Sequence, residues 1–399
     1  MPEAVIVSTA RTPIGRATKG SLVEARPDDL SAFVIGEVLR KAGIDGALVE
    51  DVIWGCAQPA GEAGYNLGRV AGILAGLDVP GTTVNRYCSS SLQTIRMAAH
   101  AVRAGEGDVF LAGGVEAVSR FQFGAADRGP HNERFADAEA RSAARAQGDG
   151  GDWAPPAGLP DIYIAMGQTA ENVAELKKVS RQRQDEFACL SQNRAEQSQA
   201  RGFLEREISP YTLPDGTVVS TDDGIRAGTT VEGLSQLKPV FKPNGTVTAG
   251  NACPLNDGAA AVVVMSDTKA KELGVRPLAR IVSSGVTAVN PEIMGLGPVA
   301  AITMALGRAE LTVADIDLFE INEAFAAQVV PSADELGIPW DKLNVNGGAI
   351  ALGHPFGMTG ARIMTTLLNG LEDADKEWGV ESMCVGGGQG MAMVVQRLS

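Results

Sequence analysis

The chain has 399 residues, 45% hydrophobic and 21% charged, which is ordinary for a globular protein and enough for two or three domains. Its formal net charge of −14 excludes nucleic-acid binding through a general basic field, so an anionic ligand would need a local cluster of basic groups. No apolar run approaches the length of a membrane span, and the first residues carry no secretory pattern. We therefore expect no nucleic-acid partner and no membrane span.

The cysteines also restrict the class of protein. The chain has five, an odd number, and none forms a Cys-x-x-Cys pair. A disulfide framework or a zinc site is therefore not expected. The sequence predicts reduced thiols, a cytoplasmic location and no bound metal.

Two halves of the chain resemble each other in the same order. The segment 4–9 (AVIVST) is echoed by 279–284, the segment 48–53 by 311–316, and 108–114 by 381–387. Short Val- and Ile-rich strands alternate with amphipathic helices in each half, at about 28–42, 89–104, 298–308 and 357–370. This pattern predicts a duplicated, layered α/β fold.

The material between the halves has a different character. Residues 121–160 mix Gly, Pro, Ala, Arg and Asp irregularly and indicate a long loop, 166–202 indicate two polar helices, and 209–250 are rich in turns. We expect residues 1–120, completed by 251–273, to form an N-terminal half and 274–399 to form a C-terminal half. Residues 121–250 would be an inserted loop domain that covers the active site.

Cys88 is the first candidate for chemistry. It follows the apparent strand 83–87 (TVNRY) and precedes a helix whose serines can supply caps. A helix N-terminus stabilises a thiolate and lowers the thiol pKa, which favours a nucleophile. A small buried core cysteine remains the alternative.

His354 is the best candidate for a base among three histidines. His100 lies within a helix and favours a structural role, and His131 lies in the irregular segment, where we expect it to be solvated. His354 stands between Gly353 and Pro355, which fix the backbone around it.

Two further positions carry polar groups at strand ends. Cys384 precedes a glycine-rich run (VGGGQG) whose backbone N–H groups can approach an oxyanion. Asn322 lies in the segment INEAF and could otherwise serve only as a helix cap. Cys56 and Cys189 have apolar neighbours, and we interpret both as core residues.

Taken together, these segments resemble the thiolase family. The motifs that carry the resemblance are residues 85–92 (NRYCSSSL), 322–325 (NEAF), 353–355 (GHP) and 384–390 (CVGGGQG). Further stretches, such as 166–174, 248–251, 256–260 and 294–298, also fit, so the resemblance spans nearly the whole chain.

The resemblance implies a function and a set of roles. The chain would be an acyltransferase that cleaves 3-ketoacyl-CoA with CoA, by ping-pong kinetics through an acyl-cysteine, in fatty acid β-oxidation. Cys88 would be the acylated nucleophile and His354 its base, while Cys384 would exchange a proton with the α-carbon of acetyl-CoA. Asn322 would hold a water for one oxyanion hole, and the backbone N–H groups of Cys88 and Gly386 would form the other.

The resemblance implies further properties. The fold would be the duplicated five-layered αβαβα thiolase fold, assembled as a homodimer or homotetramer. CoA and acyl-CoA would be substrates, and no cofactor would be needed. The residues expected to contact CoA or substrate are Arg226, Cys253, Met166, Ala324 and Phe325.

Three positions depart from the family pattern. Ser91 replaces a usual glycine, Cys253-Pro254 stands where short-chain members carry Ser-Gly, and Ala165 precedes Met166 where many acetoacetyl-specific members carry histidine. We therefore expect a 3-ketoacyl-CoA bulkier than acetoacetyl-CoA, unless Trp153 folds inward and fills the space.

Alternatives remain. One is a biosynthetic acetyl-CoA acetyltransferase, another a non-catalytic thiolase-like scaffold subunit. A third is a ketoacyl synthase, which would carry a second His or an Asn in place of Cys384.

Overall fold

The computed structural model describes residues 2–121, 126–149 and 151–399. The main strands are β1 (Ala4–Arg11), β3 (Asp51–Gly55), β4 (Gly81–Val84), β5 (Val109–Ala117), β8 (Asn256–Ser266), β9 (Ala279–Ala288), β10 (Leu318–Ile321), β11 (Trp378–Val385) and β12 (Gln389–Arg397). The main helices are α1 (Pro27–Ala42), α2 (Leu67–Leu74), α3 (Ser90–Ala104), α4 (Ala136–Ala146), α5 (Met166–Lys177), α6 (Arg181–Ala200), α9 (Gly297–Ala309), α10 (Ala326–Leu336) and α12 (Thr359–Asp373). Shorter elements are β2 (Gly15–Arg16), β6 (Tyr211–Thr212), β7 (Val218–Val219), α7 (Val231–Ser235), α8 (Asp267–Leu273) and α11 (Ala349–Leu352).

Strand pairing shows the duplication. The sheet order β4-β3-β5-β8-β1 continues through β9 into β12-β11-β10. In the first half β8 pairs antiparallel with both β1 and β5, and β3 pairs parallel with β5. In the second half β12 pairs antiparallel with both β9 and β11, and β10 pairs parallel with β11. The two halves therefore have the same topology, and they meet where β1 pairs with β9.

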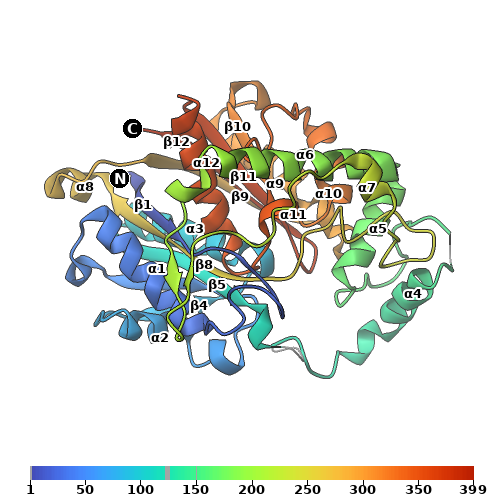
Figure 1. The fold of residues 1–399 in the computed structure, drawn as a ribbon, viewed down its shortest axis with the longest axis horizontal. Helices are drawn as coiled ribbons and strands as arrows, with labels where there is room; N and C mark the ends of the chain where they lie inside the picture. Colours follow the sequence, from blue (N-terminus) through green and yellow to red (C-terminus); the bar gives the residue numbers. More distant parts are fainter. Residues whose placement is uncertain (1, 122–125, 150) are drawn as a thin grey trace.

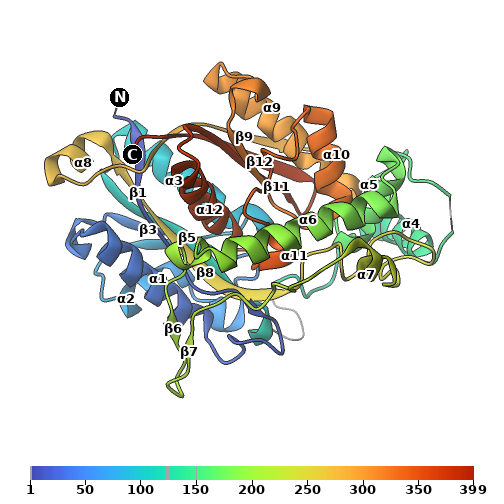
Figure 2. The same ribbon diagram turned by 45° about the horizontal axis from the view of Figure 1, so that its top comes forward.

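Five layers follow from this arrangement. Helices α1 and α2 pack on the outer face of the first half, in a core that includes Val34, Val38 and Trp54. Helices α9 and α10 cover the outer face of the second half. Between the two halves α3 lies beside α12, as Figures 1 and 2 show, and the shared core there includes Leu92 and Met364. The predicted five-layered αβαβα fold is confirmed.

In the segment between β5 and β8, one prediction is confirmed and another is wrong in part. The two helices expected within 166–202 are α5 and α6. The loop predicted for 121–160 is wrong in part, because α4 occupies Ala136–Ala146. Its sequence, ADAEARSAARA, is rich in strong helix formers, and the flanking glycines and prolines obscured that signal. Residues 122–125 and 150 of the predicted loop lie outside the described residues, and the proposed domain boundaries stay a prediction.

No helix in the described ranges combines the length and apolarity that a membrane crossing requires.

Candidate active site

The turn that carries Cys88 is a strained connection between β4 and α3. The chain leaves β4 at Val84 and makes a single 3₁₀ turn at Tyr87–Ser89. Tyr87 has a φ of 44°, which is unfavourable for a residue with a side chain, and its N–H donates to Asn85 Oδ1 at 2.8 Å. The Asn85 side chain is itself held by a 3.0 Å bond from Nδ2 to the Ala57 carbonyl. Asn85 thus holds the turn that presents Cys88.

The serines after Cys88 do not cap α3 as expected. The N-cap residue Ser89 makes no capping side-chain bond. Ser90 Oγ instead accepts the N–H of Arg86 at 3.0 Å, because the 3₁₀ turn places that group beside it. Ser91 Oγ accepts the N–H of Ala361 at 2.9 Å, so this departure from the family pattern links α3 to α12.

The Cys88 thiol is protonated at neutral pH, contrary to the thiolate expected from the sequence. Burial raises its pKa to about 11, and the charge of Glu116 adds to this effect. The backbone N–H groups of Gly386 and Cys88 oppose it. Local N–H groups therefore face the sulfur, as the sequence suggested. Their lowering of the thiol pKa is smaller than the rise that burial causes.

The backbone around His354 is fixed by close packing. Gly353 has a φ of 112°, and a Cβ there would lie 2.7 Å from both the Asn256 amide and Ile14. The N–H of His354 donates to Asn256 Oδ1 at 2.9 Å. This places the imidazole, 1% exposed, in the central layer.

Hydrogen bonds select one tautomer of His354. Thr359 Oγ1 donates to the Pro355 carbonyl at 2.7 Å, so it accepts the Nδ1–H of His354 at 2.6 Å. Nε2 is then the unprotonated nitrogen, 3.2 Å from Asn322 Nδ2. Burial lowers the pKa of His354 to about 3, with a contribution from the charge of Arg362. The imidazole is therefore neutral, and its unprotonated nitrogen accepts the Asn322 amide.

Asn322 lies in a loop that the buried carboxylate of Glu323 holds in place. Its N–H donates to the Ser382 carbonyl at 2.9 Å, and its Oδ1 is buried without a hydrogen-bond partner among the described residues. The next residue, Glu323, accepts bonds from Ser191 Oγ at 2.6 Å, Asn344 Nδ2 at 2.8 Å and the N–H of Ile350 at 3.0 Å. Glu323 thereby fixes the loop against α6 and α11.

Cys384 is fully buried near the end of β11, where it pairs with Gly390 of β12. Burial raises its pKa well above the usual value, and the neighbouring Cys88 and Cys253 thiols raise it further. Each thiol in this group disfavours ionisation of the others. The structure thus brings Cys88 and Cys384 to one place, as predicted, and adds Cys253.

A cavity of about 380 Å³ opens onto Cys88. Its lining residues are Ala57, Gln58, Tyr87, Cys88, Asp127, His131, Ile162, Tyr163, Ile164, Ala165, Met166, Phe356, Gly386 and Gly387. Of the predicted site residues, Cys88, Met166 and Gly386 line it. Ala165 lies on its wall, in the position expected to face an acyl group.

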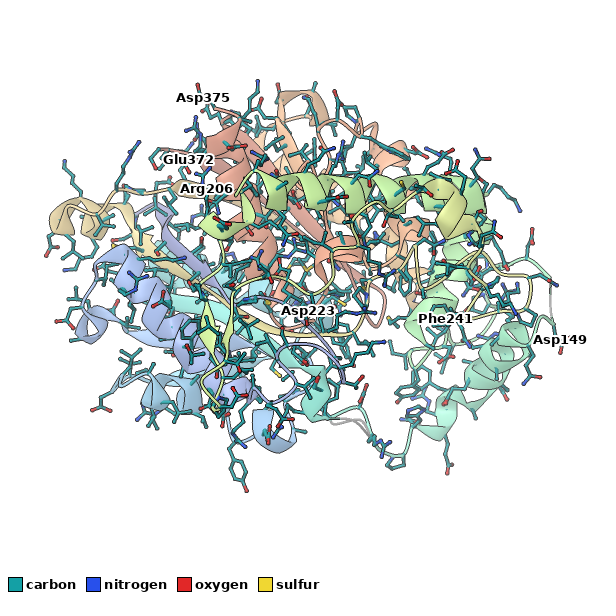
Figure 3. The ribbon with its side chains drawn as sticks, viewed as in Figure 1. Asp149, Arg206, Asp223, Phe241, Glu372 and Asp375 are labelled. Atoms are coloured by element: carbon teal, nitrogen blue, oxygen red, sulfur yellow. The ribbon has the colours of Figure 1, made fainter. Side chains whose placement is uncertain are left out.

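The other predicted substrate contacts do not line this cavity. The N–H of Cys253 donates to the Ala324 carbonyl at 3.1 Å. Phe325 packs edge-on against Phe241, with ring centroids 6.2 Å apart, and Figure 3 shows Phe241 beside α5. Arg226 is not among the cavity residues, and its N–H donates to Gln192 Oε1 at 2.8 Å.

Sequence reasoning missed part of the cavity wall. His131 is exposed, as expected, with 40% of its side chain accessible; its ring also stacks on Tyr163 with centroids 3.8 Å apart, and its Nδ1 lies 2.8 Å from Glu139 Oε2. Its partner is eight residues away on α4, the helix that the sequence analysis did not predict. Gln58 and Phe356 also line the wall, and no spacing rule pointed to either.

Trp153 does not fill the cavity. Its side chain is 6% exposed, its Nε1 donates to Glu292 Oε2 at 2.8 Å, and its N–H donates to Glu175 Oε2 at 3.0 Å. The inward conformation that would have refilled the space is therefore absent from the structure.

Two family models match the chain: "Thiolase, N-terminal domain" over residues 4–268 and "Thiolase, C-terminal domain" over residues 275–397. The chain belongs to the thiolase family. It is 44% identical to the 3-ketoacyl-CoA thiolase of Serratia proteamaculans, to a β-ketoadipyl-CoA thiolase of Acinetobacter baylyi and to the acetyl-CoA acetyltransferase of Cupriavidus necator, and each alignment covers 100% of both chains. The crystal structure of the Bacillus anthracis acetyl-CoA acetyltransferase matches with a TM-score of 0.86 at 39% identity, over 100% of this chain and 99% of that one. Thiolase relatives with three different names are thus equally similar in sequence.

The buried nucleophile leads to a prediction for chemical labelling. The rate of Cys88 alkylation by iodoacetamide should rise about tenfold per pH unit between about pH 7 and pH 10, because only the thiolate reacts and its fraction grows with pH. Mass spectrometry of digested protein would follow Cys88 by itself, with Cys88→Ser as the control for peptide assignment. A rate that levels off below about pH 8 would contradict a pKa raised by burial.

Proposed function

We propose that this thiolase cleaves 3-ketoacyl-CoA substrates with CoA, using Cys88 as nucleophile, His354 as its base and Cys384 as the acid for carbon. The observation that supports the proposal is a pair of neighbouring buried thiols, Cys88 and Cys384, together with a neutral imidazole, His354, whose packing partner Phe356 lines the same cavity as Cys88. A single thiol cannot attack the ketone and protonate the departing carbanion at the same time.

The first half-reaction makes an acyl-enzyme. Cys88 Sγ attacks the 3-keto carbon while its proton moves to Nε2 of His354. The bond between carbons 2 and 3 then breaks, its electron pair stays on the acetyl-CoA enolate, and Cys384 donates a proton to carbon 2. Acetyl-CoA leaves, and the shortened acyl group remains on Cys88.

The second half-reaction regenerates the thiols. CoA attacks the Cys88 thioester, its thiol proton passes to the Cys384 thiolate, and Cys88 recovers the proton from His354. Reversed, the same steps form a carbon–carbon bond by Claisen condensation. The mechanism uses CoA and acyl-CoA as substrates and no further cofactor.

Two sites would stabilise the oxyanions. The N–H groups of Cys88 and Gly386, which face the Cys88 sulfur, would receive the thioester oxyanion of the acyl-enzyme. His354 and a water held by the unpaired Oδ1 of Asn322 would stabilise the second oxyanion. Arg226, Cys253, Met166, Ala324 and Phe325 would contact the CoA or acyl portions.

We further propose that the enzyme acts in β-oxidation, in the cytoplasm, as a homodimer or homotetramer. Five free cysteines, two of them needed as thiols, support a reducing compartment. Exposed apolar side chains support an oligomer. Tyr65, just before α2, is 97% exposed, and Ile73 and Leu74 on α2 are 56% and 52% exposed. Helix α2 packs against β4, a strand at the edge of the sheet. A biosynthetic acetyltransferase remains the second candidate, because a relative of that name is equally similar.

Cys384→Ser separates the roles of the two thiols. The variant should still form an acyl group on Cys88 from an acyl-CoA, while thiolysis and condensation fall by about 10²- to 10⁴-fold through loss of the acid. Intact-protein mass spectrometry measures the first, and a coupled acetyl-CoA assay measures the second. Cys88→Ser should lose both. A folded Cys384→Ser protein that cannot be acylated would contradict this division of labour.

The cavity beside Ala165 predicts a preference for acyl groups larger than acetoacetyl. Each additional buried CH₂ contributes about 0.8 kcal/mol, so two or three carbons should raise kcat/KM by roughly one to two orders of magnitude. The measurement is kcat/KM across a panel of straight and branched 3-ketoacyl-CoAs. Ala165→His, which refills the wall, should reduce the preference. A clear preference of the wild type for acetoacetyl-CoA would favour the acetyltransferase alternative.

A further inference from the structure

Glu116 is a buried carboxylate near Cys88 that the proposed mechanism does not use. It lies on β5, only 1% exposed. Its Oε2 accepts the N–H of Ala57 at 2.9 Å and the N–H of Gly357 at 2.9 Å. Its Oε1 accepts the N–H of Gln58 at 3.2 Å and lies 3.6 Å from Cys56 Sγ. Three backbone donors on one buried carboxylate are a strong restraint on the segments that carry them.

Those segments belong to different halves of the fold. Ala57 and Gln58 follow β3 of the first half, and Gly357 lies three residues after His354 in the second. The backbones approach so closely here that a Cβ on Gly357 would lie 2.2 Å from the Val115 carbonyl, and one on Gly114 would lie 2.2 Å from the Gly357 carbonyl. Glu116 therefore connects the halves where they are in direct contact.

A continuous set of contacts leads from Glu116 to the nucleophile. Glu116 holds the N–H of Ala57, the Ala57 carbonyl accepts Asn85 Nδ2, and Asn85 Oδ1 accepts the N–H of Tyr87. Tyr87 is the residue with the unfavourable positive φ immediately before Cys88. On the other side, Gly357 follows Phe356, whose ring packs edge-on against His354 at 5.1 Å. Ala57, Gln58 and Phe356 also line the cavity.

The charge of Glu116 also acts on the nucleophile. Burial raises the pKa of Glu116 to about 7, and the N–H groups that it accepts oppose the rise. Its negative charge contributes to the raised pKa of Cys88. Among the described residues, Cys56, Glu62 and Arg120 line a pocket with Glu116, Asp257 pairs with Ala117 across β8 and β5, and Cys88 interacts electrostatically with Glu116. Arg120 pairs with Glu62 at 2.7 Å, and Asp257 accepts the Ser119 N–H at 2.8 Å.

We propose that Glu116 is a positioning residue for the acyl transfer: it fastens the segment 56–58 to the segment 356–358, supports the Cys88 turn, and holds a negative charge close to the thiol. The proposal rests on the proposed function for the acyl-transfer step, whereas its electrostatic part concerns the free protein.

Two readouts test the two parts separately. In Glu116→Gln the amide cannot accept all the N–H bonds and carries no charge. The midpoint of the pH dependence of Cys88 alkylation should fall by about one pH unit, because a like charge no longer opposes the thiolate. Turnover of 3-ketoacyl-CoA should nevertheless fall roughly 10- to 100-fold, because the turn and the cavity wall are less well held. Loosening of the turn alone would also expose the thiol and lower the midpoint, since burial is the main cause of the raised Cys88 pKa, so the charge-retaining variant Glu116→Asp is needed to separate the charge from the loosening.

Matched variants supply the controls. Glu171 is another buried carboxylate that accepts backbone N–H groups, from Thr246 and Val247, but it lies on α5. Glu171→Gln should leave the alkylation midpoint of Cys88 in place. Glu116→Asp keeps the charge but shortens the reach, so it should retain the wild-type midpoint and lose turnover. Thermal melting of each variant confirms that it is folded, and Glu116→Asp still tests the proposal if Glu116→Gln does not fold.

The outcomes are distinct. An unchanged alkylation midpoint in folded Glu116→Gln, an equal shift in Glu171→Gln, or wild-type turnover in both Glu116 variants would overturn the proposal. Alkylation needs no acyl-CoA, so a failure of the proposed function would show as absent turnover in the wild type while the effect of Glu116 on Cys88 would still be measurable.

Discussion

The candidate active site depends on one constraint: the two halves of the fold pack so closely at their junction that Cys88, His354 and Cys384 are largely removed from bulk solvent. Glycines 114, 357 and 360 mark this contact, because a Cβ at any of them would lie within 2.3 Å of an atom of a neighbouring segment. Cys88, His354 and Cys384 are all buried there. The desolvation that results is the largest influence on the pKa of each of them.

This burial determines the resting state of the site. A thiol with a pKa of about 11 and an imidazole with a pKa of about 3 are both neutral at pH 7. The pair holds no exposed thiolate that could react with other electrophiles. In the proposed reaction, charge would appear at Cys88, where the N–H groups of Cys88 and Gly386 are already directed at the sulfur. Preorganised donors in a dry site stabilise developing charge more effectively than water does, since they need not reorient.

The sequence predicted the layered fold because the repeat, the strand and helix periodicity and the family motifs all agree. Cys88, His354, Cys384 and Asn322 could be found because each stands in a motif between glycines or at a strand end. The direction of the Cys88 pKa shift could not be predicted, because the helix terminus is visible in the sequence whereas the burial contributed by the other half is not. Glu116 accepts a bond from Gly357 of the other half, a contact that only the assembled halves create. Thr359 and His131 contact His354 and Glu139 within their own segments, through side-chain geometry that no motif indicated. Helix α4 was missed because glycines and prolines surround a short alanine-rich segment.

The central claim is that Cys88 and His354 are both neutral in the free protein. Thiolate absorbance near 240 nm, recorded from about pH 5 to pH 10 as the difference between wild type and Cys88→Ser, tests it most directly. We expect no ionisation step for Cys88 below about pH 9. A step between about pH 5 and pH 7 that disappears in His354→Asn would reveal a preformed thiolate–imidazolium pair and contradict the account.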